Sequence, residues 1–90
     1  MTPEIREQFR QEIIAILAVA GAVGMKRAAL KMQLGIAGFE AIRDADLDNE
    51  LDYLAGKGLA GRMGKLISPE VARWKLTAEG RDYAAGEGLA

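Results

Sequence analysis

The stretch that decides the fold is residues 51–81, LDYLAGKGLAGRMGKLISPEVARWKLTAEGR. Its first part completes a leucine stripe at i, i+4 and i+7 that starts at Leu47, and this spacing predicts a helix that ends at the glycines of the GKG sequence. The period then changes to two, because residues 59–63 and 71–77 are short strand-like segments, and the second alternates apolar with basic side chains. Glycine, serine and proline between these segments favour a loop. The stretch therefore predicts a helix followed by an antiparallel hairpin with a basic tip.

The N-terminal part predicts a long first helix over residues 3–20. Thr2 is suited to cap it, Pro3 suits its first position, and apolar residues recur at helical spacing until Gly21. The second half of this helix is apolar nearly all round, and a helix of that kind is covered on two sides, by its own domain or by a second subunit. The helix is therefore a candidate contact for a homodimer.

A short second helix is expected between the long first helix and the leucine-rich one. Residues 26–34 have two inward leucines and three outward cations, and Gly35 is expected to end the helix. A short extended segment, residues 22–25, precedes this helix, and a connector follows it. Asp44, at the end of the connector, is a good N-cap for the leucine-rich helix.

The C-terminal part predicts one more helix. Thr77 can cap a helix over residues 78–85, and the tail, residues 86–90, is expected to fray. No linker between domains is visible in the sequence. We therefore predict a single domain over residues 1–90, mainly α with a small β-hairpin, in which a three-helix core is followed by the hairpin at about residues 59–77 and by the short last helix.

The composition excludes several classes of protein. The 90 residues include no Cys and no His, so disulfides, thiolate nucleophiles, imidazole bases and the usual zinc or haem ligands are ruled out. We therefore expect a protein that is not an enzyme, with no catalytic residue, no metal site and no cofactor. The longest nearly uncharged run, Ile13–Met25, is shorter than the ~20 residues that span a bilayer, and with no visible targeting signal this favours a cytoplasmic protein.

The expected order of helix, short strand, helix, turn, helix, hairpin and helix resembles a winged helix-turn-helix domain. The sequence Leu51–Leu59, LDYLAGKGL, is similar to the end of the third helix in MarR-like and ArsR-like regulators, and Trp74–Arg81, WKLTAEGR, is similar to the exit from their second wing strand. The connector from Leu34 to Asp44 is longer than the turn typical of those regulators, and it also resembles small winged-helix proteins of Mu-like prophages. The resemblance implies a small bacterial or phage transcription regulator that binds double-stranded DNA, with its third helix in the major groove.

The net charge of −1 hides a strong segregation of charge along the chain. Residues 26–43 carry +3 and residues 57–75 carry +4, whereas the predicted third helix, residues 44–56, carries −5. The solvent face of that helix offers one residue suited to adenine, Asn49, and several aspartates that repel phosphates. Aspartates also repeat along it at i, i+4, and this spacing destabilises a helix unless a cation or a partner relieves the repulsion.

Two sets of surface residues are candidates for two different functions. A DNA-binding surface would use the cations of the second helix and of the hairpin together with one residue of the third helix: Lys26, Arg27, Lys31, Asn49, Arg62, Lys65, Arg73 and Lys75. A protein-interaction module without DNA binding would instead offer the acidic third helix to its partner: Asp46, Asp48, Asp52 and Tyr53. The same charges also have a plainer interpretation as ordinary solvated surface residues.

Overall fold

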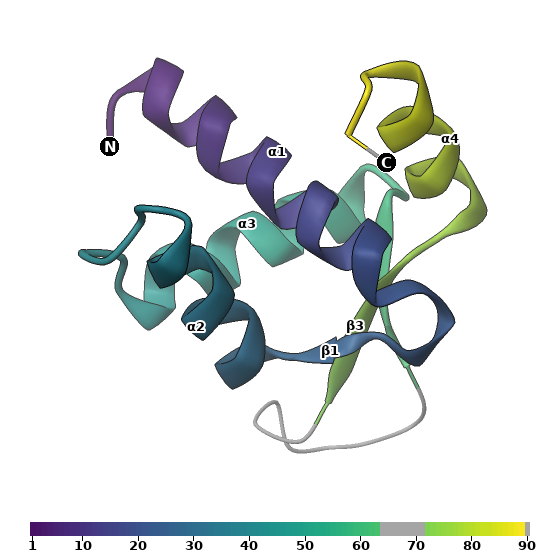
Figure 1. Cartoon of the computed structure of the whole chain (residues 1–90), viewed down its shortest axis with the longest axis horizontal. Helices are drawn as coiled ribbons and strands as arrows, with labels where there is room; N and C mark the ends of the chain where they lie inside the picture. Colours follow the sequence, from purple (N-terminus) through teal and green to yellow (C-terminus); the bar gives the residue numbers. More distant parts are fainter. Residues whose placement is uncertain (64–71, 90) are drawn as a thin grey trace.

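The computed structural model of this chain describes residues 1–63 and 72–89, which form four α-helices and a small antiparallel sheet (Figure 1). The elements follow one another as α1 (Pro3–Ala20), a 3₁₀ turn (Gly21–Val23), β1 (Met25–Lys26), α2 (Arg27–Ile36), α3 (Asp44–Gly56), β2 (Ala60–Met63), β3 (Arg73–Leu76) and α4 (Ala78–Gly86). The protein is therefore mainly helical with a small three-stranded sheet, and the predicted class is confirmed at this level.

Threonine side chains cap the starts of α1 and α4, whereas α2 has no side-chain cap and α3 starts one residue earlier than predicted. Thr2 caps α1 as predicted, because its hydroxyl accepts a hydrogen bond of 3.2 Å from the Ile5 backbone N–H. The prediction that Asp44 caps α3 is wrong, since Asp44 is already the first helical residue and Arg43 is the N-cap. The Asp46 carboxylate accepts a 3.2 Å hydrogen bond from the Arg43 backbone N–H, and this contact fixes the start one residue earlier.

Three predicted loop or end segments differ from the structure. Gly35 does not end α2, because the helix continues to Ile36 and the chain turns at Gly38, whose φ of 109° suits glycine. A 3₁₀ turn takes the first half, Ala22 and Val23, of the extended segment predicted at residues 22–25, and Met25 begins β1. The tail expected to fray is held as far as Leu89, whose backbone N–H donates to the Ala84 carbonyl at 2.7 Å and whose side chain packs against the core.

The sheet joins three segments in the order β1-β3-β2, with both pairs antiparallel. Met25 lies opposite Trp74 and Lys26 opposite Arg73, while Arg62 lies opposite Trp74 from the other edge. Directly opposite residues share a face of a sheet. The buried Trp74 therefore marks the inner face, as predicted from its alternation with basic residues, and Arg73 marks the outer face.

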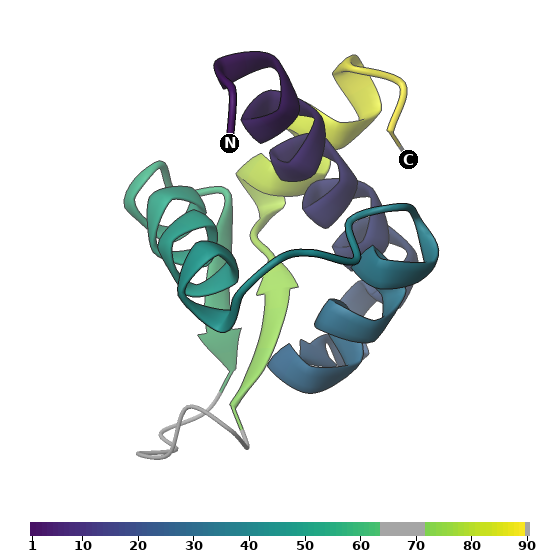
Figure 2. The same ribbon diagram turned by 90° about the vertical axis from the view of Figure 1, so that its left-hand side faces the viewer.

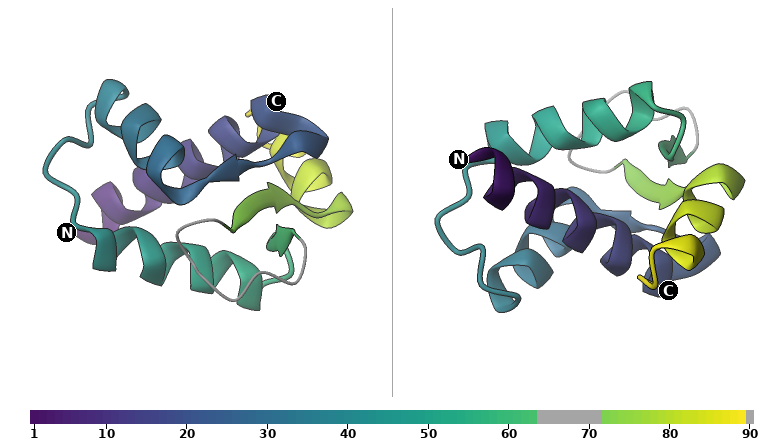
Figure 3. Two further views of the ribbon diagram at one scale, coloured as in Figure 1. Left: turned by 90° about the horizontal axis from the view of Figure 1, so that it is seen from below. Right: turned by 90° about the horizontal axis from the view of Figure 1, so that it is seen from above.

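The core lies between α1, α2, α3 and the inner face of the sheet. In Figure 2 and in the left view of Figure 3, α2 and α3 lie on either side of the sheet, and the right view of Figure 3 shows α1 crossing between them. The leucine stripe of α3 points inward as predicted. Within residues 1–63 and 72–89, the largest fully buried side chains are Phe9, Ile13, Ile14, Leu17, Leu30, Leu34, Leu47, Leu51 and Leu54.

A compact contact joins the start of α4 to the turn between α3 and β2. The Thr77 hydroxyl accepts a hydrogen bond from the Gly80 backbone N–H at 3.0 Å and donates one to the Gly58 carbonyl at 2.6 Å. The Thr77 backbone N–H also donates to the Leu59 carbonyl at 3.0 Å. Gly80 lies so close to that carbonyl that a Cβ at this position would overlap its oxygen. This contact explains the threonine and glycine of the LTAEG sequence in physical terms.

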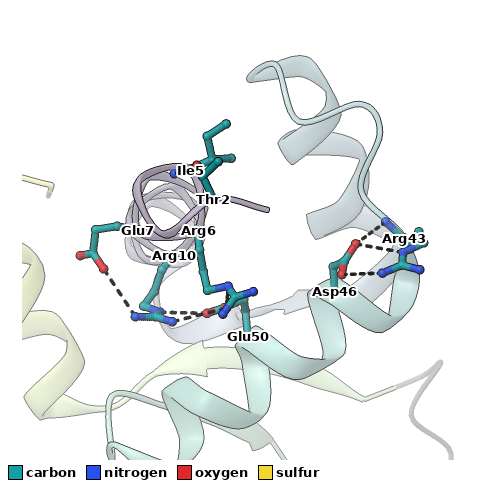
Figure 4. A network of polar contacts seen from close by, with 8 residues as sticks. All are labelled: Thr2, Ile5, Arg6, Glu7, Arg10, Arg43, Asp46 and Glu50. Atoms are coloured by element: carbon teal, nitrogen blue, oxygen red, sulfur yellow. Dashed lines mark hydrogen bonds and ion pairs between the residues drawn. The ribbon is translucent and has the colours of Figure 1, made fainter.

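A buried carboxylate fixes α1 against α3. Glu50 is 6 % exposed, and the Arg10 side chain donates to it from Nε at 2.8 Å, with Arg6 further away at 3.8 Å (Figure 4). The hydrogen bond to Glu50 raises the pKa of Arg10 above its usual value. Figure 4 also shows a second guanidinium–carboxylate pair, between Arg43 and Asp46, at the exposed start of α3.

These two pairs give a matched test of burial. Replacing Arg10 with methionine is expected to lower the free energy of unfolding by about 2 kcal/mol, because Glu50 then remains buried without its main cation. The loss is smaller than for a wholly enclosed pair, since Arg6 stays near. Replacing Arg43 with methionine removes an equivalent but exposed pair, and little change is expected. Urea unfolding of the two variants measures the difference, and an equal loss in both would show that the burial of Glu50 has no such effect.

Candidate nucleic-acid interface

Three cations from two strands meet on the outer face of the sheet. The antiparallel register places Lys26 of β1 directly opposite Arg73 of β3, and Lys75 follows two residues later on the same face. Lys26 and Arg73 are exposed, and Lys75 is half-buried. On the neighbouring strand Gly61, which has no side chain, lies opposite Lys75. We call Lys26, Arg73 and Lys75 the cationic sheet face.

The cationic sheet face is not neutralised within the described part of the chain. No carboxylate there lies within ion-pair distance of Lys26, Arg73 or Lys75. Like charges directly opposite each other on neighbouring strands destabilise a sheet. The pair Lys26 and Arg73 therefore has an unfavourable interaction that an anion bound to this face would relieve.

The cations of α2 behave differently, because they lie against α3. Arg27 Nη1 donates to both carboxylate oxygens of Asp48, at 3.1 and 3.0 Å, and Lys31 Nζ donates to Asp44 at 2.6 Å. The hydrogen bond from Lys31 lowers the pKa of Asp44 below its usual value. The positive charge of α2 and the negative charge of α3 thus oppose each other in space. These ion pairs also relieve the repulsion expected from the i, i+4 aspartates.

The solvent face of α3 carries little that could bind duplex DNA. Asn49 and Asp52 are exposed, as predicted from the inward leucines. Asp46 is half-buried and bonded to Arg43, and hydrogen bonds from the Arg43 side chain and backbone lower its pKa. Tyr53 is partly covered, because the Arg10 guanidinium lies 3.8 Å from its ring centroid. Four residues were predicted to meet a protein partner: Asp46, Asp48, Asp52 and Tyr53. Of these, only Asp52 is exposed and has neither an ion pair nor a ring contact in the described ranges.

Of the two other cations predicted for the hairpin, the structure describes Arg62, which does not join the cationic sheet face. Arg62 shares the inner face with Trp74, yet it is exposed, and its guanidinium lies 5.7 Å from the Trp74 ring centroid. This placement holds the Arg62 charge near the end of β2, on the other side of the sheet from the cationic sheet face. Lys65 lies outside the described residues.

Three residues have structural roles that the sequence pattern does not predict. Glu50 is a charged residue in a helix of many carboxylates, and nothing in its spacing separates it from its exposed neighbours. Gly80 lies inside a predicted helix, where a glycine indicates close packing but does not identify the Leu59 carbonyl that it meets. The sequence pattern assigns Lys26 to the second helix. Its place in β1 depends on the pairing of β1 with β3, which cannot be derived from local periodicity.

Neither a metal site nor a membrane span is found in residues 1–63 and 72–89. Over these ranges no three His, Cys, Asp or Glu residues gather in a way that could hold a metal ion. No helix in the same ranges has both the length and the apolar character needed to cross a bilayer.

No protein-family model matches the chain, no curated protein is detectably similar to it, and no solved structure matches its fold.

Proposed function

We propose that this chain is a winged-helix module that binds double-stranded DNA through its cationic sheet face. The order of elements supports the winged-helix assignment, since α2 and α3 are followed by the antiparallel pair of β2 and β3, and β1 completes the sheet on the other side of β3. In this proposal β2 and β3 are the strands of the wing. The role that fits such a small module is that of a bacterial or phage transcription regulator.

The observation that carries the proposal is the set of three adjacent cations without carboxylate partners in the described ranges. Most ionised side chains of α1, α2 and α3 lie in ion pairs, whereas Lys26, Arg73 and Lys75 are left to solvent. A nucleic-acid duplex presents closely spaced negative charges, and cations that neutralise them release condensed counterions. A phosphate backbone is thus the polyanion that best relieves the repulsion on this face.

Binding through this face is expected to discriminate weakly between sequences. Lysine and arginine side chains that contact phosphates position a protein on the duplex but carry no base information. Asn49 is the one good base reader on the solvent face of α3, and its neighbour Asp52 would meet phosphates unfavourably if α3 entered the groove. We therefore place α3 away from the major groove, in contrast to the docking that the family resemblance implies.

A titration with a labelled random-sequence duplex at low salt tests the proposal. We expect an affinity at or tighter than the range of about 1 to 100 µM that is usual for non-specific binding, together with weakening as salt increases. A matched single strand of the same length is the comparison for duplex preference. Absence of binding at tens of micromolar (about 50 µM) in low salt would contradict the proposal.

The alternative function, a protein-interaction module that uses α3, receives less support. Asp46 and Asp48 of that surface are bonded to Arg43 and Arg27, so they are less available to a basic partner. Asp52 and the partly covered Tyr53 remain, and two residues make a small contact. We retain this function as the second candidate, for the case in which the duplex titration shows no binding.

A further inference from the structure

Among the residues of the three described strands that lie on the outer face of the sheet, Gly61 alone has no side chain. It lies within β2, directly opposite Lys75 of β3. Arg73 follows on the same face two residues from Lys75, and Lys26 lies opposite Arg73 from the other edge of the sheet. The cationic sheet face therefore borders a stretch of backbone that no side chain covers from its own position.

The fold of the described residues does not require a glycine at position 61. Five glycines in these ranges have φ between 64° and 109°, a region that other residues rarely adopt, and Gly61 is not among them. A Cβ built on Gly61 meets no atom within 4 Å apart from its chain neighbours, so a side chain would have room. Gly24 is different, because it has a positive φ and a Cβ there would lie 2.7 Å from the Trp74 carbonyl oxygen.

Glycine is also an unfavourable residue for this strand. Inside a strand it loses more conformational freedom on folding than other residues do, and it has no side chain to pack. A glycine in such a position often marks a place where a ligand or another backbone approaches closely. The adjacent cations, which have no carboxylate partners in the described ranges, indicate that a ligand at this place is an anion.

We infer that Gly61 is a positioning residue of the cationic sheet face, where the uncovered backbone lets a phosphate of the duplex come close enough to contact Lys75. This inference rests on the proposed function. The attraction between a cation and a phosphate falls with distance and is screened by water and salt, so a side chain that keeps the phosphate away weakens it. Lys75 is half-buried, so it has less freedom to reach around such a side chain than the exposed Lys26 and Arg73 have.

A valine at position 61 tests the inference in the duplex titration. Gly61→Val adds an uncharged, β-branched side chain that suits a strand and offers no hydrogen bond to a phosphate. We expect duplex binding at low salt to weaken about fivefold, and the slope of log affinity against log salt to flatten by about 0.9, since one phosphate is no longer neutralised. Gly61→Ala adds a smaller group, and a weakening of about twofold is expected.

Gly86→Val on α4 is the matched control. A Cβ on Gly86 also meets no atom within 4 Å, and the residue lies in another element of the fold. We expect this variant to keep the affinity and the salt slope of the unchanged chain. A double variant, Gly61→Val with Lys75→Gln, shows whether the two residues act together. If Gly61 acts through Lys75, the double variant binds duplex as tightly as Lys75→Gln alone.

The outcomes separate this inference from the proposed function. If the unchanged chain binds no duplex, both are wrong. If the unchanged chain binds and Gly61→Val binds equally tightly, only the inference is wrong. Circular-dichroism melts are expected to show that Gly61→Val is at least as stable as the unchanged chain, and a lower melting temperature would overturn the inference, because the fold would then require the glycine. Additive losses from Gly61→Val and Lys75→Gln would also overturn it.

Discussion

An alanine at Gly80 is expected to lower the free energy of unfolding by about 3 kcal/mol, the largest effect on stability predicted for a single methyl group in this protein. The added Cβ would overlap the Leu59 carbonyl oxygen and would lie 3.2 Å from the Leu76 Cβ. A backbone carbonyl cannot change rotamer, so α4 has to move. Movement of α4 breaks the hydrogen bonds of Thr77 to Gly58 and Gly80. Urea unfolding followed by circular dichroism measures the loss.

Gly86→Ala in the same helix is the matched control. A Cβ on Gly86 meets no atom within 4 Å, and alanine is the better helix former. We therefore expect no loss, or a gain of up to about 1 kcal/mol, from the same chemical change. If the two variants lose stability equally, the close approach of α4 to Leu59 does not hold in solution.

Neutralising the cationic sheet face is expected to have the largest effect on function. A triple variant, Lys26→Gln with Arg73→Gln and Lys75→Gln, should weaken duplex binding by roughly two orders of magnitude at low salt, because each phosphate that is no longer neutralised keeps its condensed counterions. For the same reason the slope of log affinity against log salt should flatten by about 0.9 for each such phosphate. The fold should persist, since removing opposed like charges relieves repulsion in the sheet.

The matched control removes the same net charge from other surfaces. Arg43→Gln, Lys57→Gln and Arg81→Gln lie at the start of α3, after its end and on α4, and all three side chains are exposed. We expect the control triple to keep most of the affinity and of the salt slope. Fluorescence anisotropy with one labelled duplex measures both triples. Equal weakening would mean that net charge, and not the cationic sheet face, governs the binding.

Local sequence pattern predicted much of the fold because local physics governs those parts. The i, i+4 and i+7 leucines, the caps Thr2 and Thr77, and the alternation around Trp74 each depend on neighbours in the chain. The end of α2 could not be predicted in the same way. Gly35 adopts helical geometry, and the helix stops only where Gly38 turns the chain.

The candidate site depended on side-chain packing that no local pattern contains. The sequence showed a basic second helix and an acidic third helix, but whether these charges meet is a matter of packing. The structure pairs Arg27 with Asp48 and Lys31 with Asp44. Lys26, the residue before Arg27, lies instead on the outer face of the sheet, because it belongs to β1 and pairs with β3. Two adjacent cations therefore differ in their surroundings: Arg27 is neutralised by Asp48, whereas Lys26 is exposed.

We propose that the duplex meets the outer face of the sheet and not α3. Amide chemical-shift changes in the ¹⁵N-labelled protein, on addition of a short duplex, test this claim most directly. We expect the largest changes in β1 and β3, at Lys26, Arg73 and Lys75, and small changes along α3 at Asn49 and Asp52. The largest changes along the solvent face of α3, with β1 and β3 unaffected, would contradict the claim.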